Sequence, residues 1–215
     1  QTDNLLYPWG NERVSVELTW KPGSAYRLRV LDALTLEEVG EPVGATDPDQ
    51  GGAVVRFLPE KGRRYRIQVQ RVGQLAGPFR LIVLGGDLAY STPHGSIAFP
   101  ADGPEVIAVG AVDADGERLP YSCCGLPQGL LKPDFTAPVP FPSLWRSRPF
   151  TGTSAAAPQA AGLAALCWSR HPDWTAHRVR RYLQAAAIDL ASPGPDCETG
   201  HGLIRLPPPH EERWP

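Results

Sequence analysis

The pattern of apolar residues changes once along the chain, near residue 85, and this change constrains the fold more than any other feature. Before it, short segments alternate apolar and polar residues, which is the period of a β-strand with one buried face. These segments are 14–20, 26–30, 53–57, 65–69 and 79–83. After about Pro104 the apolar residues form a continuous run or recur at helical spacing. The sequence therefore predicts an α+β two-part chain.

The first part, residues 1–86, is predicted to be an antiparallel β-sandwich of jelly-roll-like type. Turn residues separate its strands, as at Lys21-Pro22-Gly23 and Glu60-Lys61-Gly62. Several short half-buried strands joined by such turns favour two packed antiparallel sheets. Trp9 and Trp20 would suit a carbohydrate platform, although tryptophans at strand positions usually fill cores.

The second part, residues 87–206, has an α/β pattern, and residues 207–215 are predicted to be a loose tail. The continuous apolar run 106–112 is typical of a strand buried on both faces. A helix is predicted from about Thr153 to Arg170, and a second one after Thr175, a residue that caps helices well. The buried face of the first helix is expected to hold Leu163, Leu166 and Cys167.

The start of the first of these helices has the pattern of a serine nucleophile. Gly152 and Thr153 let the backbone turn sharply before Ser154, and an alanine-rich run then begins the helix. A serine at that place is exposed, and unpaired N–H groups and the positive end of the helix dipole lie beside it. Those N–H groups can bind a developing oxyanion. Pro158 removes the N–H that would otherwise bond the Ser154 carbonyl.

The segment Phe150–Gly162 resembles the nucleophile segment of the subtilisin-like serine proteases, in which Gly-Thr-Ser is followed by small residues, Pro and Ala-Gly. Other segments are similar to family motifs and follow in the family's order. Ala101–Asp113 resembles the strand that precedes the substrate-binding region, and Lys132–Pro138 is similar to Lys-Pro-Asp-x-x-Ala-Pro. Tyr121–Gly125 occupies the place of Ser-Ser-x-Gly-Pro, and Thr199–Ile204 is similar to a closing Thr-Gly-Tyr-Gly turn.

The resemblance implies a secreted serine endopeptidase of the subtilase (peptidase S8) family, which hydrolyses polypeptides through an acyl-enzyme on Ser154. Gly152 and Thr153 would belong to its oxyanion and nucleophile segment. The substrate-binding strand would consist of Ser122, Cys123, Cys124 and Gly125. Residues 1–86 would be an accessory domain, similar to pre-peptidase domains, inserted ahead of the nucleophile.

The family's aspartate, histidine and oxyanion asparagine segments are absent from this sequence. Of the five histidines, His94, a loop residue near Asp102, is the strongest candidate for a base, although a solvated turn is its expected place. We therefore expect the nucleophile-bearing, C-terminal portion of a longer or two-chain protease, inactive alone, whose partner is the upstream half. The alternatives are a catalytically dead subtilisin-like binding protein and a β-sandwich module that binds a polymer or a protein.

The residue pattern predicts no metal or cofactor. Asp47–Gly52 alternates carboxylates and glycines as a calcium loop does, although a solvated turn is favoured. Cys197 could pair with Cys123 or Cys124, whereas Cys167 is expected to be a buried thiol. The net charge of −2 gives no basic face for nucleic acid. No apolar stretch reaches the roughly 18 residues of a membrane span.

Overall fold

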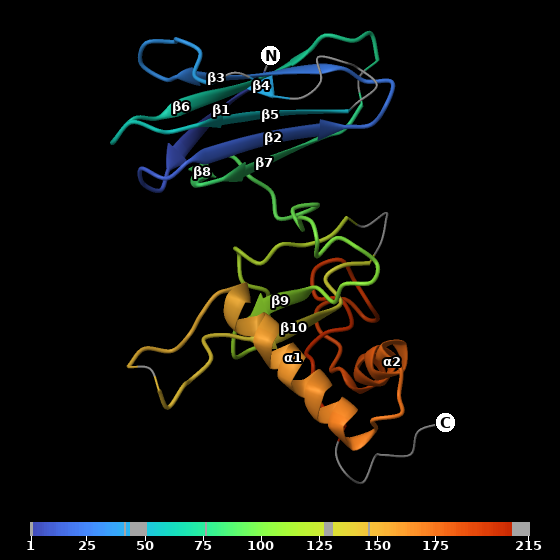
Figure 1. The fold of residues 1–215 in the computed structure, drawn as a ribbon. Helices are drawn as coiled ribbons and strands as arrows, with labels where there is room; N and C mark the ends of the chain where they lie inside the picture. Colours follow the sequence, from blue (N-terminus) through green and yellow to red (C-terminus); the bar gives the residue numbers. More distant parts are fainter. Residues whose placement is uncertain are drawn as a thin grey trace. The chain divides into compact units, whose positions relative to one another are not determined.

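The computed structural model describes residues 2–40, 42–43, 51–75, 77–126, 131–145 and 147–207. The chain divides into two compact units, Gln1–Ser91 and Thr92–Pro215. The first is built from antiparallel sheets, and the second contains the helices (Figure 1). The predicted mixed α+β character is confirmed.

The described residues of the first unit form two four-stranded antiparallel sheets with the orders β3-β6-β1-β8 and β4-β5-β2-β7. The strands are β1 (Thr2–Pro8), β2 (Val14–Trp20), β3 (Tyr26–Asp32), β4 (Pro42–Val43), β5 (Gly52–Phe57), β6 (Tyr65–Arg71), β7 (Phe79–Leu84) and β8 (Gly86–Leu88). Alternate residues of β2, β3, β5 and β6 meet in one core, which includes Val16, Val30, Val55 and Ile67. The jelly-roll-like class of this unit stays a prediction.

The first unit extends to Ser91, beyond the predicted boundary at residue 86, because β8 pairs with β1 through Leu6 and Leu88. Trp20 is buried in the core, so it cannot belong to a surface platform. Trp9 by contrast is 70% exposed. Trp20 therefore fills the core, as is usual for a tryptophan at a strand position, and it shares no surface platform with Trp9.

The second unit contains a two-stranded parallel sheet, β9 (Val109–Val112) and β10 (Phe135–Pro138), and two helices. Helix α1 (Thr153–Arg170) begins and ends where the sequence predicts, and α2 (Ala176–Ala186) follows Thr175, whose hydroxyl accepts a hydrogen bond from the Arg178 N–H. The strand predicted over residues 106–112 is longer than the observed β9. Val106 and Ile107 precede β9 and are 39% and 36% exposed, so the prediction of burial on both faces is wrong for them.

Small side chains let α1 lie close to the parallel sheet. Ala155, Ala156 and Ala160 share a core with residues of β9 and β10, which are Ala111, Phe135 and Ala137. Cys167 is buried as predicted, but Leu166 is 55% exposed and faces no core. None of the helices in the described part of the chain is long and apolar enough to cross a bilayer. The calcium-loop prediction at Asp47–Gly52 lies mainly outside the described residues, as does the loose tail.

Candidate active site

The backbone at the start of α1 exposes Ser154. Gly152 has φ 81° and ψ 171°, a left-handed conformation that a side chain would oppose, and the helix begins at the next residue. The Ala155 N–H donates to the Gly152 carbonyl at 2.9 Å, and no side chain caps the helix. Ser154 is exposed, and within the described residues neither its hydroxyl nor its N–H has a hydrogen-bond partner. This is the arrangement that an attacking hydroxyl beside an anion-binding N–H requires.

Pro158 and Gln159 shape the first turn of α1 in different ways. Pro158 lies inside the helix and has no N–H, so the Ser154 carbonyl lacks its ordinary helical donor. The Gln159 Nε2 donates to the Pro138 carbonyl at the end of β10 and to the Ala155 carbonyl, both at 2.9 Å. The serine therefore sits on a turn that is tied to the edge of the parallel sheet.

The described histidines have other surroundings. The His94 Nε2 lies 4.0 Å from a Glu198 carboxylate oxygen, and His171 stacks on Trp174 with 3.9 Å between ring centroids. His177 is exposed on α2, and His201 lies beside Phe135. Burial lowers the pKa of His201 more than the nearby Asp134 carboxylate raises it. Since none of these imidazoles hydrogen-bonds Ser154, the described residues supply no general base to it.

The segment predicted to be the substrate-binding strand is largely occupied by contacts within the unit. The Ser122 side chain is buried, and its hydroxyl accepts from the Ala111 N–H at 2.9 Å. The Cys124 N–H donates to the Pro93 carbonyl, and the Gly125 N–H donates to the carbonyls of Lys132 and Cys197. Only Cys123 presents its side chain to solvent in this segment. Substrate binding here remains a prediction, and these backbone groups would have to exchange partners to perform it.

All four cysteines are free thiols in this structure. Burial raises the pKa of Cys124 and of Cys167, which disfavours their reactive thiolate forms. Cys197 is half-buried next to the 122–125 segment, and its carbonyl accepts from Gly125. Among the residues that the structure describes, no three His, Cys, Asp or Glu side chains are grouped so that they could hold a metal ion.

A buried ion cluster lies at the N-terminal end of the parallel sheet. The Lys132 ammonium pairs with the Asp134 carboxylate at 2.8 Å and donates to the Val106 carbonyl. Asp134 also accepts from the Ala108 N–H at 2.8 Å and pairs with Arg180 of α2. This cluster joins three parts of the unit: helix α2, the residues that precede β9 and the residues that precede β10. The Lys-Pro-Asp motif identified two of its members, whereas nothing local in the sequence pointed to Arg180.

The chain belongs to the subtilase family, whose model matches residues 85–202. Subtilisin DY from Bacillus licheniformis is 33% identical over 126 residues, which are 59% of this chain and 44% of that protein. Subtilisin E from Bacillus subtilis (strain 168) is 34% identical over 121 residues, 56% of this chain and 31% of that protein. The chain thus covers less than half the length of these curated relatives.

A solved structure has a similar fold over almost the whole chain. The CspB protease of Clostridium perfringens aligns with a TM-score of 0.69 and 20% sequence identity. The alignment covers 97% of this chain, which includes both units, and 56% of the CspB chain. At this identity the likeness establishes the fold and carries no assignment of individual residues.

Proposed function

We propose that this chain is the nucleophile-bearing portion of a subtilisin-like serine endopeptidase. The observation that carries the proposal is the exposed Ser154 at the uncapped start of α1, inside the segment that matches the subtilase model. In the reaction the Ser154 oxygen attacks a peptide carbonyl, and its proton passes to a base and then to the leaving amine. Water afterwards releases the acyl group from Ser154. The Ser154 N–H holds the oxyanion that forms in each half of the reaction.

The base, its orienting carboxylate and a second oxyanion donor come, in this proposal, from an upstream half of the same protease. A serine hydroxyl is a weak nucleophile without an adjacent base. The described residues provide Ser154 with no such base. The isolated chain is accordingly inactive. The first unit is then an insertion ahead of the nucleophile, and secretion is inferred from the family resemblance alone.

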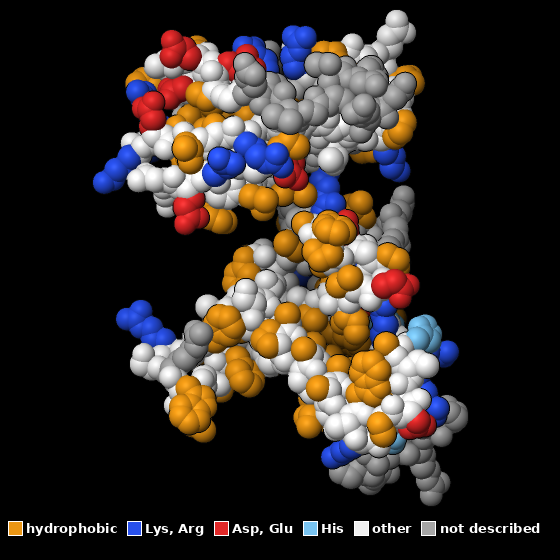
Figure 2. Space-filling view, viewed as in Figure 1, with side chains coloured by type: hydrophobic (Ala, Val, Ile, Leu, Met, Phe, Trp, Pro, Cys, Tyr) orange, Lys and Arg blue, Asp and Glu red, His pale blue; other side chains and the backbone are white. Residues whose placement is uncertain are grey.

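The surface of α1 supports the existence of such a partner. From Ser154 to Trp168 the exposed positions on the solvent side of the helix carry only small or apolar side chains, among them Ala157, Ala161, Ala165, Leu166 and Trp168, and a charged residue is exposed only at its end, Arg170. No atom outside the helix lies within 4 Å of the point where a Gly162 side chain would begin. Figure 2 shows hydrophobic side chains spread over this side of the helix. A helix that is apolar on all sides is normally buried on all sides.

The parallel sheet also has an unfilled edge. The carbonyls of Ala108 and Val112 accept hydrogen bonds from N–H groups of β10 and the residue after it. Because backbone groups alternate in direction along a strand, the N–H and carbonyl groups of Val109 and Ala111 point to the opposite edge of β9. Ala111 is paired there, with the Ser122 hydroxyl and the Leu119 N–H. The N–H and carbonyl of Val109 have no partner among the described residues. Parallel sheets are generally covered on both faces and extended by further strands, so a strand of the upstream half fits this edge.

Active-site labelling with a fluorophosphonate tests the proposal. The product of the complete gene should label at Ser154 and cleave a peptide substrate, and Ser154→Ala should abolish both. Ser169→Ala, which alters an exposed serine of the same helix, is the matched control and should change neither. The chain alone should label only at the background rate. Peptide hydrolysis by the chain alone that requires Ser154 would refute the dependence on a partner, and a complete product without Ser154 labelling would favour the non-catalytic alternative.

A further inference from the structure

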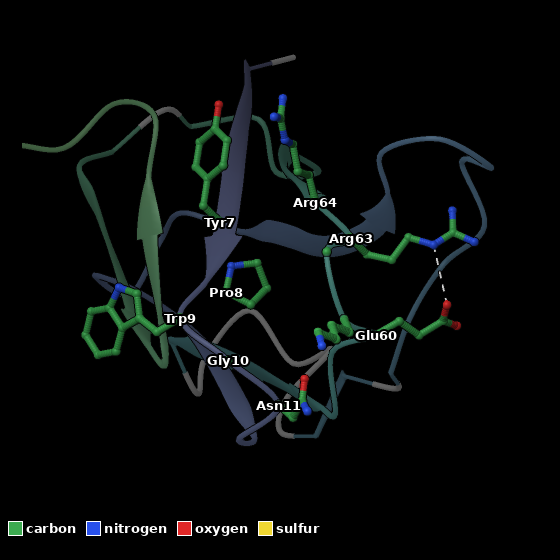
Figure 3. Close-up of a pocket in the computed structure, with 10 residues that line it drawn as sticks. Tyr7, Pro8, Trp9, Gly10, Asn11, Glu60, Arg63 and Arg64 are labelled. Atoms are coloured by element: carbon green, nitrogen blue, oxygen red, sulfur yellow. Dashed lines mark ion pairs between the residues drawn. The ribbon is translucent and has the colours of Figure 1, made fainter.

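A depression of about 480 Å³ lies on the first unit, between two turns of the chain. Residues 7–11, at the end of β1, form one side, and residues 60–64, which lead into β6, form the other. Figure 3 shows Tyr7 and Arg64 side by side on one rim, with Trp9 at the opposite end from the Glu60–Arg63 ion pair. The depression belongs to the first unit, whereas Ser154 belongs to the second.

The charged side chains around the depression differ in whether an ion pair compensates them. Arg63 is paired with Glu60 at 3.4 Å and with Asp32 at 3.6 Å, so its charge is already compensated. Lys61 and Arg64 pair with no carboxylate among the residues that the structure describes. The Arg64 guanidinium lies over the Tyr7 ring, 5.4 Å from its centroid. That stacking fixes the group while its N–H edges remain free for a carboxylate. A chain of net charge −2 thus carries a local positive site.

Hydrogen bonds anchor the two turns that flank the depression. Trp9 is 70% exposed, although large aromatic side chains are usually at least half buried. Its N–H donates to the Gly85 carbonyl at 3.1 Å, which anchors the turn that carries it. On the opposite side the Glu60 N–H donates to the Tyr65 hydroxyl at 2.8 Å. The ring and the two cations are therefore presented by turns that need little ordering on binding.

We propose that this depression binds an anionic polysaccharide, with a sugar ring stacked on Trp9 and acidic groups on Lys61 and Arg64. The choice between a polysaccharide and an acidic protein follows from the lining. Ten of the described residues line the depression, and none of these ten is Leu, Ile, Val, Met or Phe. Protein partners are usually anchored by side chains in apolar pockets. An acidic sugar needs an aromatic face, cations and polar groups such as Asn11, all of which are present.

Calorimetric titration of the whole chain with tetragalacturonate tests this site directly, and it requires no proteolytic activity. Tetragalacturonate should bind, and its affinity should fall as salt is raised from about 50 mM to about 500 mM, because exposed charge pairs are screened. Cellotetraose, of the same length but uncharged, should bind more weakly by about tenfold or more. Equal binding of the two sugars, no binding of tetragalacturonate, or tighter binding of tetraglutamate would overturn the proposal.

Variants then locate the binding. Trp9→Ala and Arg64→Ala should each weaken tetragalacturonate binding by about tenfold or more. Trp145→Ala changes a tryptophan that is 94% exposed in the second unit, and Arg27→Ala changes an exposed arginine of β3. Both control variants should bind as the parent does. Circular dichroism melting of every variant shows whether the fold is kept, and equal losses in the folded test and control variants would refute the location.

Discussion

The buried ion cluster of the second unit allows a quantitative test of how the parallel sheet β9–β10 is stabilised. The side chains of Lys132 and Asp134 are each 3% exposed, while that of Arg180 is 20% exposed. Removing one partner of a buried pair costs about 3–5 kcal/mol, because the other charge is left without compensation. Lys132→Met leaves Asp134 with Arg180 and the Ala108 N–H, and it also removes the donor to the Val106 carbonyl. We therefore expect a loss near 3 kcal/mol for this variant.

Arg180→Met should cost less, about 1 kcal/mol, because Arg180 is more exposed and Lys132 continues to neutralise Asp134. The assay is differential scanning calorimetry, in which the transition of the first unit serves as the internal reference. A loss of 3 kcal/mol lowers the midpoint of the second unit by roughly 10 °C. The Ala108 N–H donates to Asp134, so its amide hydrogen exchange should accelerate more in Lys132→Met than in Arg180→Met. If Arg180→Met proved as costly as Lys132→Met, or if both cost under about 1 kcal/mol, the burial argument would be refuted.

Three further predictions concern titration, reactivity and backbone geometry. Burial holds the pKa of His201 below its ordinary 6.5, so the unfolded chain takes up a proton at a higher pH than the folded chain does. The free energy of unfolding should therefore fall as pH drops below 6.5. Chemical denaturation at a series of pH values should show this slope, and His201→Tyr should flatten it. Iodoacetamide with mass mapping should modify exposed Cys123 well before Cys124, whose pKa burial raises, and comparable rates would contradict the buried placement. Gly202 has φ +94° and a Cβ there would strike the Ile188 carbonyl, so Gly202→Ala should destabilise by at least about 2 kcal/mol in thermal melts, whereas Gly194→Ala, with open space around it, should cost about 1 kcal/mol.

The sequence predicted most of the regular elements because their patterns are local. Alternation identified β2, β3, β5, β6 and β7, and the capping residue Thr175 marked the start of α2. Strand β1 was missed because Leu5 and Leu6 are adjacent and interrupt the alternation. Strand β8 has only three residues, too few to show a period.

The candidate site was predictable only in part. Small residues around Ser154 were enough to place it at the first turn of a helix. The burial of Ser122 was not predictable, because it depends on a hydrogen bond to Ala111, eleven positions away. The exposure of Leu166 was missed for a different reason. A helical stripe shows which residues share a side, but whether a partner covers that side is decided outside the helix.

The order of the two units along the chain determines when Ser154, the proposed nucleophile, is synthesised. Helix α1 follows the entire first unit, so Ser154 leaves the ribosome only after β1 to β8 have been made. Domains generally fold as they emerge, beginning with the N-terminal one. A ribosome-bound chain that has just completed the first unit therefore has that unit folded but neither helix α1 nor Ser154.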